Sequence, residues 1–350
     1  MFKFSKIIAC LLLFTATTGK AQNFTQAFGL NGASLKTTLH QLIANHNDLG
    51  WPLWFYFPKT DSLPVNRVWD IYSNNPTTGP AYDLYFGSDQ CGTYSQEGDC
   101  FNHEHTWPST YFNDAFPMRS DLHHVLPTDG FVNNKRSNFP YGKVTGALSW
   151  TAQNGAKLGK SNTYPNYTLN VFEPIDSFKG DLARIYFYMS TRYEGEDANW
   201  VDWEMANKAV LKDSAVALLL RWHHNDPVSA KEIKRNNAIA QLQNNRNPFI
   251  DYPIFADCIW GTADCTALGL NNINTKPTLL VYPNPCADMV HVQHPSNNIP
   301  NQLTVYNIFG NTVAQAINTS AISLGHLTPG YYYIEVRYNE SRSRLKLIKQ

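Results

Sequence analysis

Two short segments within residues 100–139 hold the densest concentration of reactive side chains in this sequence. The first contains His103, Glu104 and His105, and the second runs from Asp121 to His124. An imidazole has an unperturbed pKa of about 6.5, so it can carry a proton near neutral pH. A carboxylate beside it can hold a cation. A base that activates water and a cation that neutralises phosphate charge are what phosphodiester hydrolysis requires, so the segments predict hydrolytic chemistry.

The metal preference follows from the residue types. Magnesium takes oxygen ligands and needs only one or two from the protein, so Glu104 and one asparagine carbonyl oxygen suffice. His105 then acts as a base without binding the metal. A zinc hydrolase is the chemical alternative, with nitrogen ligands from His103, His105 and His123. It is disfavoured because the H-E-x-x-H spacing of zinc proteases is absent.

The geometry of the first segment constrains its structure. Adjacent side chains of a regular strand point to opposite faces. Glu104 and His105 can therefore serve one phosphate only where the strand ends, bulges or twists. Pro108 fits a chain that leaves its strand shortly after His105.

Several helices are expected around these segments. Apolar residues recur at helical spacing in Asp181–Tyr193 and in Lys208–Trp222. Ser229 and Glu232 have the spacing of a capping box, so a further helix begins there. Short strands and long loops are expected elsewhere, which predicts a mixed α+β domain over residues 22–265.

Composition and the N-terminus indicate an exported globular protein. The chain has 350 residues, 43% of them hydrophobic and 13% aromatic, which excludes wholesale disorder. Its net charge is zero, which counts against a tight nucleic-acid binder but leaves room for a local basic groove. Lys3 and Lys6 precede an apolar run, Ile7–Phe14, that is too short to span a bilayer. This predicts a signal peptide over residues 1–21, with a lipoprotein signal ending at Cys10 as the alternative.

Export permits disulfide bonds among the five cysteines that remain after cleavage. Proximity in the sequence suggests the pairs Cys91–Cys100 and Cys258–Cys265, with Cys286 left over.

The C-terminal part has a different pattern. The Asn- and Thr-rich residues 266–278 indicate a linker. Short apolar runs separated by turn signals follow over residues 279–350 and predict a small β-sandwich. No cluster of catalytic residue types occurs there.

The chemistry-bearing segments resemble the endonuclease I family. The resemblance is carried by Cys-Phe-Asn-His-Glu-His-Thr-Trp-Pro from Cys100, by Asp-Leu-His-His from Asp121 and by Val-Asn-Asn-Lys-Arg-Ser-Asn-Phe from Val132. Further similar stretches include Trp69–Ser73 and Asn245–Phe249, so the likeness covers most of residues 30–255. It implies a ββα-metal (His-Me finger) nuclease core with added helices.

The resemblance also implies roles for individual residues. Glu104 and Asn133 would bind Mg²⁺, with Mn²⁺ or Ca²⁺ as alternative ions, and His105 would be the general base. An arginine between the two motifs stabilises the leaving phosphate in some members, and Arg119 is the only arginine in that interval. The implied activity is sequence-nonspecific cleavage of DNA, with RNA as a further substrate, to products with 5′-phosphate ends.

A basic stripe is predicted to contact the phosphate backbone, with a merely solvated face as the alternative. No run of exposed aromatic residues in the sequence suggests base stacking. The candidate nucleic-acid contacts are Lys135, Arg136, Arg184, Lys231, Lys234, Arg235 and Arg246.

The tail resembles a type IX secretion C-terminal sorting domain. Val281–Pro285, Val305–Gly310, Leu324–Tyr331 and the terminal Lys346–Lys349 carry the resemblance. It implies the type IX secretion machinery as a partner and an extracellular or cell-surface location. The alternative is a carbohydrate-binding or adhesive sandwich on a noncatalytic surface protein, in which Tyr331–Tyr333 form the platform and alternation buries at least one ring.

Overall fold

The computed structural model describes residues 22–266, 279–293, 299–307, 310–338 and 341–350. The chain divides into two compact units, Met1–Gly269 and Leu270–Gln350, which are described separately. The signal peptide predicted over residues 1–21 lies outside the described residues, as does the predicted linker from residue 267 onward. No helix among the residues described is long and apolar enough to cross a membrane.

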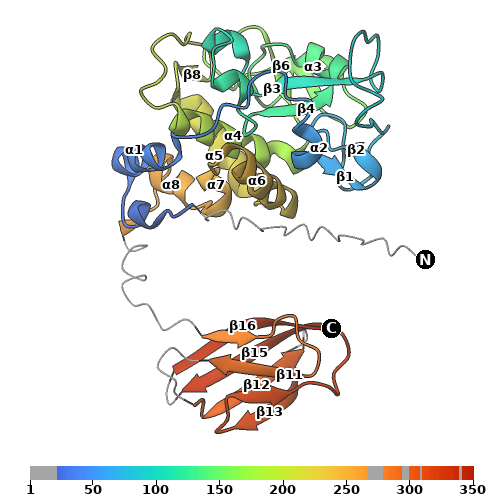
Figure 1. Cartoon of the computed structure of the whole chain (residues 1–350). Helices are drawn as coiled ribbons and strands as arrows, with labels where there is room; N and C mark the ends of the chain where they lie inside the picture. Colours follow the sequence, from blue (N-terminus) through green and yellow to red (C-terminus); the bar gives the residue numbers. More distant parts are fainter. Residues whose placement is uncertain (1–21, 267–278, 294–298, 308–309, 339–340) are drawn as a thin grey trace, which may run out of the picture. The chain divides into compact units, whose positions relative to one another are not determined.

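The reactive segments lie on two strands and one helix of the first unit. Strand β3 (Phe101–His105) pairs antiparallel with β4 (Val125–Asp129), with His105 opposite Val125. The chain passes from β4 directly into helix α3 (Gly130–Arg136) (Figure 1). Asp129 caps this helix by accepting a hydrogen bond from the Val132 amide at 2.9 Å. The two segments that the sequence separates are thereby brought side by side.

Helix α4 (Lys179–Arg192) crosses the centre of this unit, between the β3–β4 pair and helices α6 (Ala230–Gln243) and α7 (Pro248–Asp251) (Figure 1). Every residue from Gly180 to Arg192 is buried, so the helix is enclosed on all sides rather than on the one face that its periodicity predicts. Tyr186 on α4 donates a hydrogen bond to the carbonyl of Thr106 at 2.7 Å, directly beyond the end of β3. The central helix therefore supports the end of this strand.

The other helices agree with the sequence in part. Helix α6 (Ala230–Gln243) begins with the predicted capping box of Ser229 and Glu232. The helix predicted from Lys208 is wrong in its first turn, because α5 (Asp213–Asn225) begins later. Val210–Leu211 instead forms strand β9, which pairs with β8 (Ala206–Asn207) in a short hairpin.

The remaining elements of the first unit surround these. The helices are α1 (Gly32–Ile43), α2 (Phe57–Thr60), α7 (Pro248–Asp251) and α8 (Phe255–Trp260). The strands are β1 (Ser62–Leu63), β2 (Arg67–Val68), β5 (Leu148–Thr151), β6 (Lys157–Lys160) and β7 (Asn170–Glu173). Short 3₁₀ helices occupy Thr25–Ala27, Pro64–Asn66, Ser109–Phe112, Met118–Ser120 and Asp176–Phe178.

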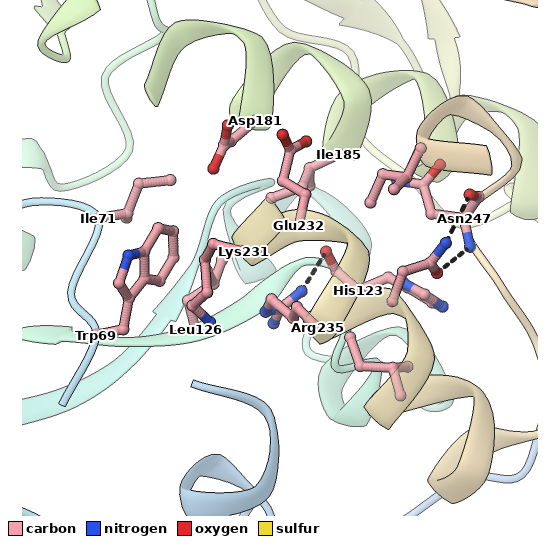
Figure 2. Close-up of a pocket in the computed structure, with 13 residues that line it drawn as sticks. Trp69, Ile71, His123, Leu126, Asp181, Ile185, Lys231, Glu232, Arg235 and Asn247 are labelled. Carbon is pink, nitrogen blue, oxygen red and sulfur yellow. Dashed lines mark hydrogen bonds between the residues drawn. The ribbon is translucent and has the colours of Figure 1, made fainter. Parts of the chain in front are cut away.

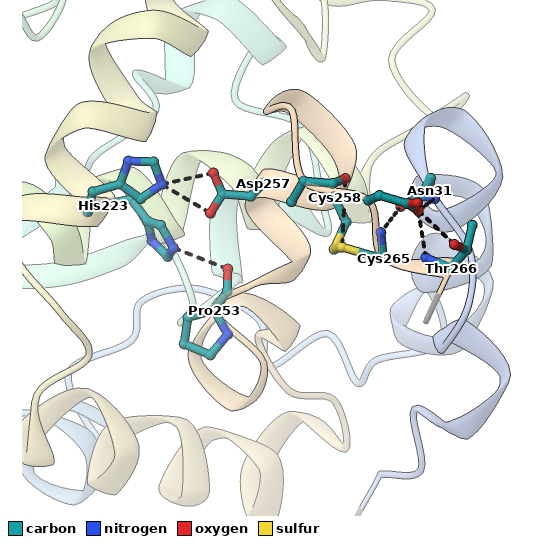
Figure 3. The surroundings of a disulfide bond; sticks show 10 residues. Asn31, His223, Pro253, Asp257, Cys258, Cys265 and Thr266 are labelled. Carbon is teal, nitrogen blue, oxygen red and sulfur yellow. Dashed lines mark hydrogen bonds and ion pairs between the residues drawn. A yellow bond between two sulfur atoms is a disulfide. The ribbon is translucent and has the colours of Figure 1, made fainter. Parts of the chain in front are cut away.

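Both predicted disulfides are confirmed. Cys91 and Cys100 are bonded with their Cα atoms 4.9 Å apart, and Cys258 and Cys265 with theirs 5.7 Å apart. Figure 3 shows the second bond, where the Cys265 amide also donates to the Asn31 side chain at 2.9 Å. Asn31 is the N-cap residue of α1, so this hydrogen bond joins the end of the unit to its first long helix, whereas the disulfide joins it to α8.

The second unit consists of strands alone among its described residues. One sheet has the order β10-β11-β14, and the other β13-β12-β15-β16. The ring of Tyr332 lies inward, whereas those of Tyr331 and Tyr333 are 58% and 45% exposed, as alternation predicts. The strands are β10 (Leu280–Tyr282), β11 (Met289–Gln293), β12 (Gln302–Asn307), β13 (Thr312–Ile317), β14 (Ala321–Ser323), β15 (Gly330–Tyr338) and β16 (Ser341–Lys349).

Candidate active site

A hollow of about 270 Å³ lies where strand β3 ends beside helix α3. Glu104, His105 and Asn133 all line it, together with Pro108. Strand β3 ends at His105, as predicted, and keeps a regular register with β4 up to that residue. The side chains of Glu104 and His105 still lie on opposite faces of the strand, and both reach the hollow at the strand end. The structure thus brings the three principal predicted site residues together.

Glu104 lies on the face of β3 that packs against α3. Its carboxylate is buried and accepts a hydrogen bond from the Tyr72 hydroxyl at 2.7 Å. The guanidinium of Arg136 forms an ion pair with the same oxygen, Oε1, at 2.9 Å. Burial raises the pKa of Glu104 to about 7, against the opposing effects of Arg136 and the Tyr72 hydrogen bond.

Arg136 joins this carboxylate to the backbone of the next two residues. Its guanidinium donates to the carbonyl oxygen of His105 at 3.1 Å and to that of Thr106. One buried cation therefore fixes both the Glu104 side chain and the chain end that carries His105.

Asn133 is held by its amide nitrogen. Nδ2 donates to the Asn102 side chain at 2.7 Å and to the carbonyl of His103 at 3.1 Å. Because both of these bonds to β3 use Nδ2, the amide oxygen Oδ1 of Asn133 is left to bind another group. Asp70 supports the arrangement by accepting a hydrogen bond from the amide of Asp129, the cap of α3, at 2.8 Å.

His105 lies on the other face of β3. Its Nε2 is 3.1 Å from the carbonyl oxygen of Arg119, so this nitrogen carries the proton and Nδ1 carries a lone pair. The ring stacks on Trp51 with centroids 5.4 Å apart. Burial, reinforced by neighbouring His124, lowers the pKa of His105 to about 3. The imidazole is therefore unprotonated throughout the neutral range.

The other histidines of the two reactive segments are His103, His123 and His124. Each is hydrogen-bonded to the backbone, as expected for packing residues. His103 accepts from the Leu53 amide at 3.1 Å, and His124 lies 2.7 Å from the Met118 carbonyl. His123 lies 3.4 Å from the carbonyl of Asn245. The structure does not favour the zinc alternative, because His103 and His123 are already hydrogen-bonded to the backbone. Among the described residues, no three histidine, cysteine or acidic side chains are grouped as metal ligands.

Three of the predicted nucleic-acid contacts are wrong. The side chains of Arg136, Arg184 and Arg235 are at most 8% exposed, and each forms an ion pair with a buried carboxylate. A buried guanidinium paired in this way is committed to the fold and has no surface to offer a phosphate. Arg184 binds Glu232 and Arg235 binds Asp61.

The remaining basic candidates differ in exposure. Figure 2 shows Lys231 and Arg235 on α6 beside Asp181 and Glu232, where they line a small interior pocket. Lys231 is bound to Asp61 at 3.2 Å, and Arg246 to Asp251 at 2.6 Å. The predicted stripe on α6 is thus largely an internal ion-pair cluster. Lys234 is exposed, and Lys135 is half-buried.

Arg119 is adjacent to the site through its backbone. Its guanidinium lies over the Trp51 ring, 5.0 Å from the centroid, and its side chain does not line the hollow. Trp51 and Tyr72 are not among the predicted site residues, although they contact His105 and Glu104 directly. The available signals were the aromatic cluster from Trp51 to Tyr56 and the stretch Trp69–Ser73, and neither indicates which residues it contacts.

Comparison with known proteins adds to this geometry. The family model described as Endonuclease I matches residues 31–254, which include every residue of the hollow. This chain belongs to the endonuclease I family. The match agrees with the resemblance carried by the sequence motifs. Nucleases of this family are generally dependent on a divalent metal.

Three curated relatives of this family member are named as extracellular nucleases. Extracellular ribonucleases of Bacillus amyloliquefaciens and Bacillus subtilis (strain 168) are 34% and 35% identical to it. These alignments cover 68% and 67% of this chain and 77% and 76% of the relatives. An extracellular deoxyribonuclease of Aeromonas hydrophila is 29% identical over 38% of this chain and 50% of its own length. The endonuclease I family member is a nuclease, and the alternative of a noncatalytic surface protein is not favoured.

The second unit has its own match. A family model described as a secretion system C-terminal sorting domain matches residues 280–350. With the extracellular relatives, this match shows that the endonuclease I family member is secreted.

Proposed function

We propose that this endonuclease I family member hydrolyses phosphodiester bonds of DNA and RNA without sequence specificity, leaving 5′-phosphate ends. The β3–β4–α3 unit is the ββα-metal core in this proposal. The observation that carries it is the convergence of Glu104, His105 and Asn133 on one hollow.

The oxygen atoms at the hollow fit a hard divalent cation. The hydrogen bond from Tyr72 and the ion pair with Arg136 both use Oε1 of Glu104, so Oε2 is the oxygen assigned to the metal. Oδ1 of Asn133 is the second protein ligand. A carboxylate and an amide oxygen suit Mg²⁺, and the same donors accept Mn²⁺ or Ca²⁺. When bound, the cation supplies positive charge at the scissile phosphate and at the leaving oxygen.

The residues of the chain supply the proton transfer. Nδ1 of His105 takes a proton from the attacking water, while the bond from Nε2 to the Arg119 carbonyl holds the ring. That carbonyl also stabilises the imidazolium that forms. The Arg119 guanidinium is proposed to stabilise the leaving phosphate, a role supported by its place beside His105 and by the family resemblance.

Contacts with the substrate are proposed to be mainly with phosphates. Lys135 follows Asn133 on α3, and Lys234 is exposed on α6, so both can meet a polyanion. Lys231 and Arg246 are weaker candidates because each is already bound to a carboxylate. The names of the relatives support both substrates: two are extracellular ribonucleases and one an extracellular deoxyribonuclease.

The C-terminal unit is proposed to address the enzyme to the type IX secretion machinery. Its support is the match to a secretion sorting domain over residues 280–350.

A nicking assay tests the catalytic proposal. Wild-type protein is expected to relax supercoiled plasmid in Mg²⁺ and to degrade RNA, and EDTA should stop both reactions. His105→Ala should leave the plasmid largely intact. Plasmid cleavage that persists in EDTA would contradict the metal assignment, and cleavage by His105→Ala at the wild-type rate would contradict the base assignment.

A further inference from the structure

Aromatic residues that are far apart in the sequence meet beside His105. Trp51 stacks on the imidazole, and the guanidinium of Arg119 lies over the Trp51 ring, 5.0 Å from its centroid. The same guanidinium lies 5.9 Å from the centroid of the Phe116 ring. The sequence contains no run of exposed aromatic residues that suggests stacking, whereas the fold places these two rings, from separate segments, near one guanidinium.

This stack runs from the proposed base to the solvent. It begins at His105, which is half-buried, and ends at Phe116, which is 47% exposed. Arg119 connects the two ends, since its carbonyl oxygen contacts Nε2 of His105 and its guanidinium contacts both aromatic rings. A half-exposed phenylalanine beside a guanidinium has the chemistry that binds a flat π-system.

We propose that Phe116 and Arg119 form a stacking site for an unpaired nucleobase next to the scissile phosphate. The inference rests on the proposed function, because it requires nucleic acid to cross the hollow at Glu104 and His105. Aromatic rings and guanidinium planes stack on every base, so the site is tolerant of sequence. Only an unstacked base can reach it, so it favours single strands over duplexes.

The test compares binding of two probes without cleavage. The full chain is mixed in EDTA with a fluorescein-labelled single-stranded DNA dodecamer or with the corresponding blunt duplex, and fluorescence anisotropy gives the Kd. Wild-type protein is expected to bind the single strand more tightly. Phe116→Leu should weaken single-strand binding by about tenfold and change duplex binding by less than about twofold, because it removes only the stacked ring.

Two control variants separate stacking from general effects. Phe55→Leu is matched, because Phe55 is 70% exposed and also lies under a cation, with Lys59 Nζ 3.9 Å from its centroid. It should leave both affinities unchanged. Phe116→Tyr keeps a ring and should bind the single strand as wild type does.

The proposal is overturned if wild-type protein binds the duplex at least as tightly as the single strand. It is also overturned if Phe116→Leu weakens both probes equally or neither. Failure of the catalytic proposal is read separately, from the plasmid assay with EDTA and His105→Ala, since the anisotropy measurement involves no cleavage.

Discussion

The two faces of strand β3 have opposite surroundings, although adjacent residues form them. On the α3 face, Glu104 is buried beside a guanidinium and a phenol, from Arg136 and Tyr72. On the other face, the half-buried imidazole of His105 lies among aromatic rings and hydrogen-bonds the Arg119 carbonyl. The α3 face therefore places a positive charge beside the Glu104 carboxylate. The other face places almost no opposite charge beside the His105 imidazole.

This difference explains how one strand can prepare two chemical roles. A buried carboxylate paired with a cation can stay ionised and accept a metal. A desolvated imidazole without an anionic partner stays unprotonated, so its ring nitrogen has a lone pair that can accept a proton. The comparison leads to predictions for each face.

The largest expected effect is on the aromatic face. His105→Ala should lower the single-turnover rate of DNA cleavage at saturating Mg²⁺ by about 10²–10⁴-fold, the usual contribution of a general base. His224→Ala is the control, because His224 is exposed and paired with Asp257 away from β3. A rate for His105→Ala within a few-fold of wild type would mean that the base is elsewhere.

The next effect is on the charged face. Arg136→Met should lower the free energy of unfolding by about 3–5 kcal/mol in EDTA, because it leaves the Glu104 carboxylate buried without its cation. Urea titration followed by tryptophan fluorescence measures it, since the nine tryptophans all precede residue 261. The double variant with Glu104→Gln and Arg136→Met should recover much of the free energy of unfolding that Arg136→Met loses. A loss below about 1 kcal/mol, typical of a surface pair, would show that the ion pair is not buried in solution.

A third effect appears on acidification. His124, whose ring lies 5.5 Å from that of His105, has its pKa lowered to about 4 by burial, against the opposing charge of Asp121. The unfolded chain binds its proton near pH 6.5, so the stability from this group is complete above that pH and is lost as the pH falls toward 4.

Wild-type protein should therefore lose more stability than His124→Gln over that range, by roughly 1.4 kcal/mol per pH unit. Glutamine can still donate to the Met118 carbonyl, as His124 does now. Urea titrations of both proteins at several pH values between 6 and 4 measure the difference. Equal pH slopes would contradict a buried, neutral His124.

The smallest expected effect concerns phosphate contacts. Lys135→Ala should reduce kcat/KM for DNA a few-fold at low salt and lower the slope of log affinity against log salt by about one. Lys234→Ala tests whether α6 shares the contact. If Lys135→Ala leaves the salt slope unchanged, Lys135 does not bind the phosphate backbone.

Much of this arrangement was predictable because its signals are local. The capping box of Ser229 and Glu232 lies within four residues and fixed the start of α6. The disulfides close short loops, and the alternation along β15 predicted that at least one of the three tyrosines is buried. The end of β3 near Pro108 was readable for the same reason.

The partners of the arginines were not predictable. Arg235 binds Asp61, which lies 174 positions earlier in the chain, and Arg136 binds Glu104 across two elements. A sequence shows that an arginine is present but not whether a phosphate or a buried carboxylate faces it. The same limit hid Trp51, which becomes part of the site only when its loop folds over His105.

The most direct test of the central claim separates the metal ligand from the base. Isothermal titration with Mn²⁺, without nucleic acid, should give wild-type affinity for His105→Ala and at least about tenfold weaker binding for Glu104→Gln. Both variants should be deficient in cleavage. Loss of Mn²⁺ binding in His105→Ala, or wild-type binding in Glu104→Gln, would contradict the assignment of the two residues.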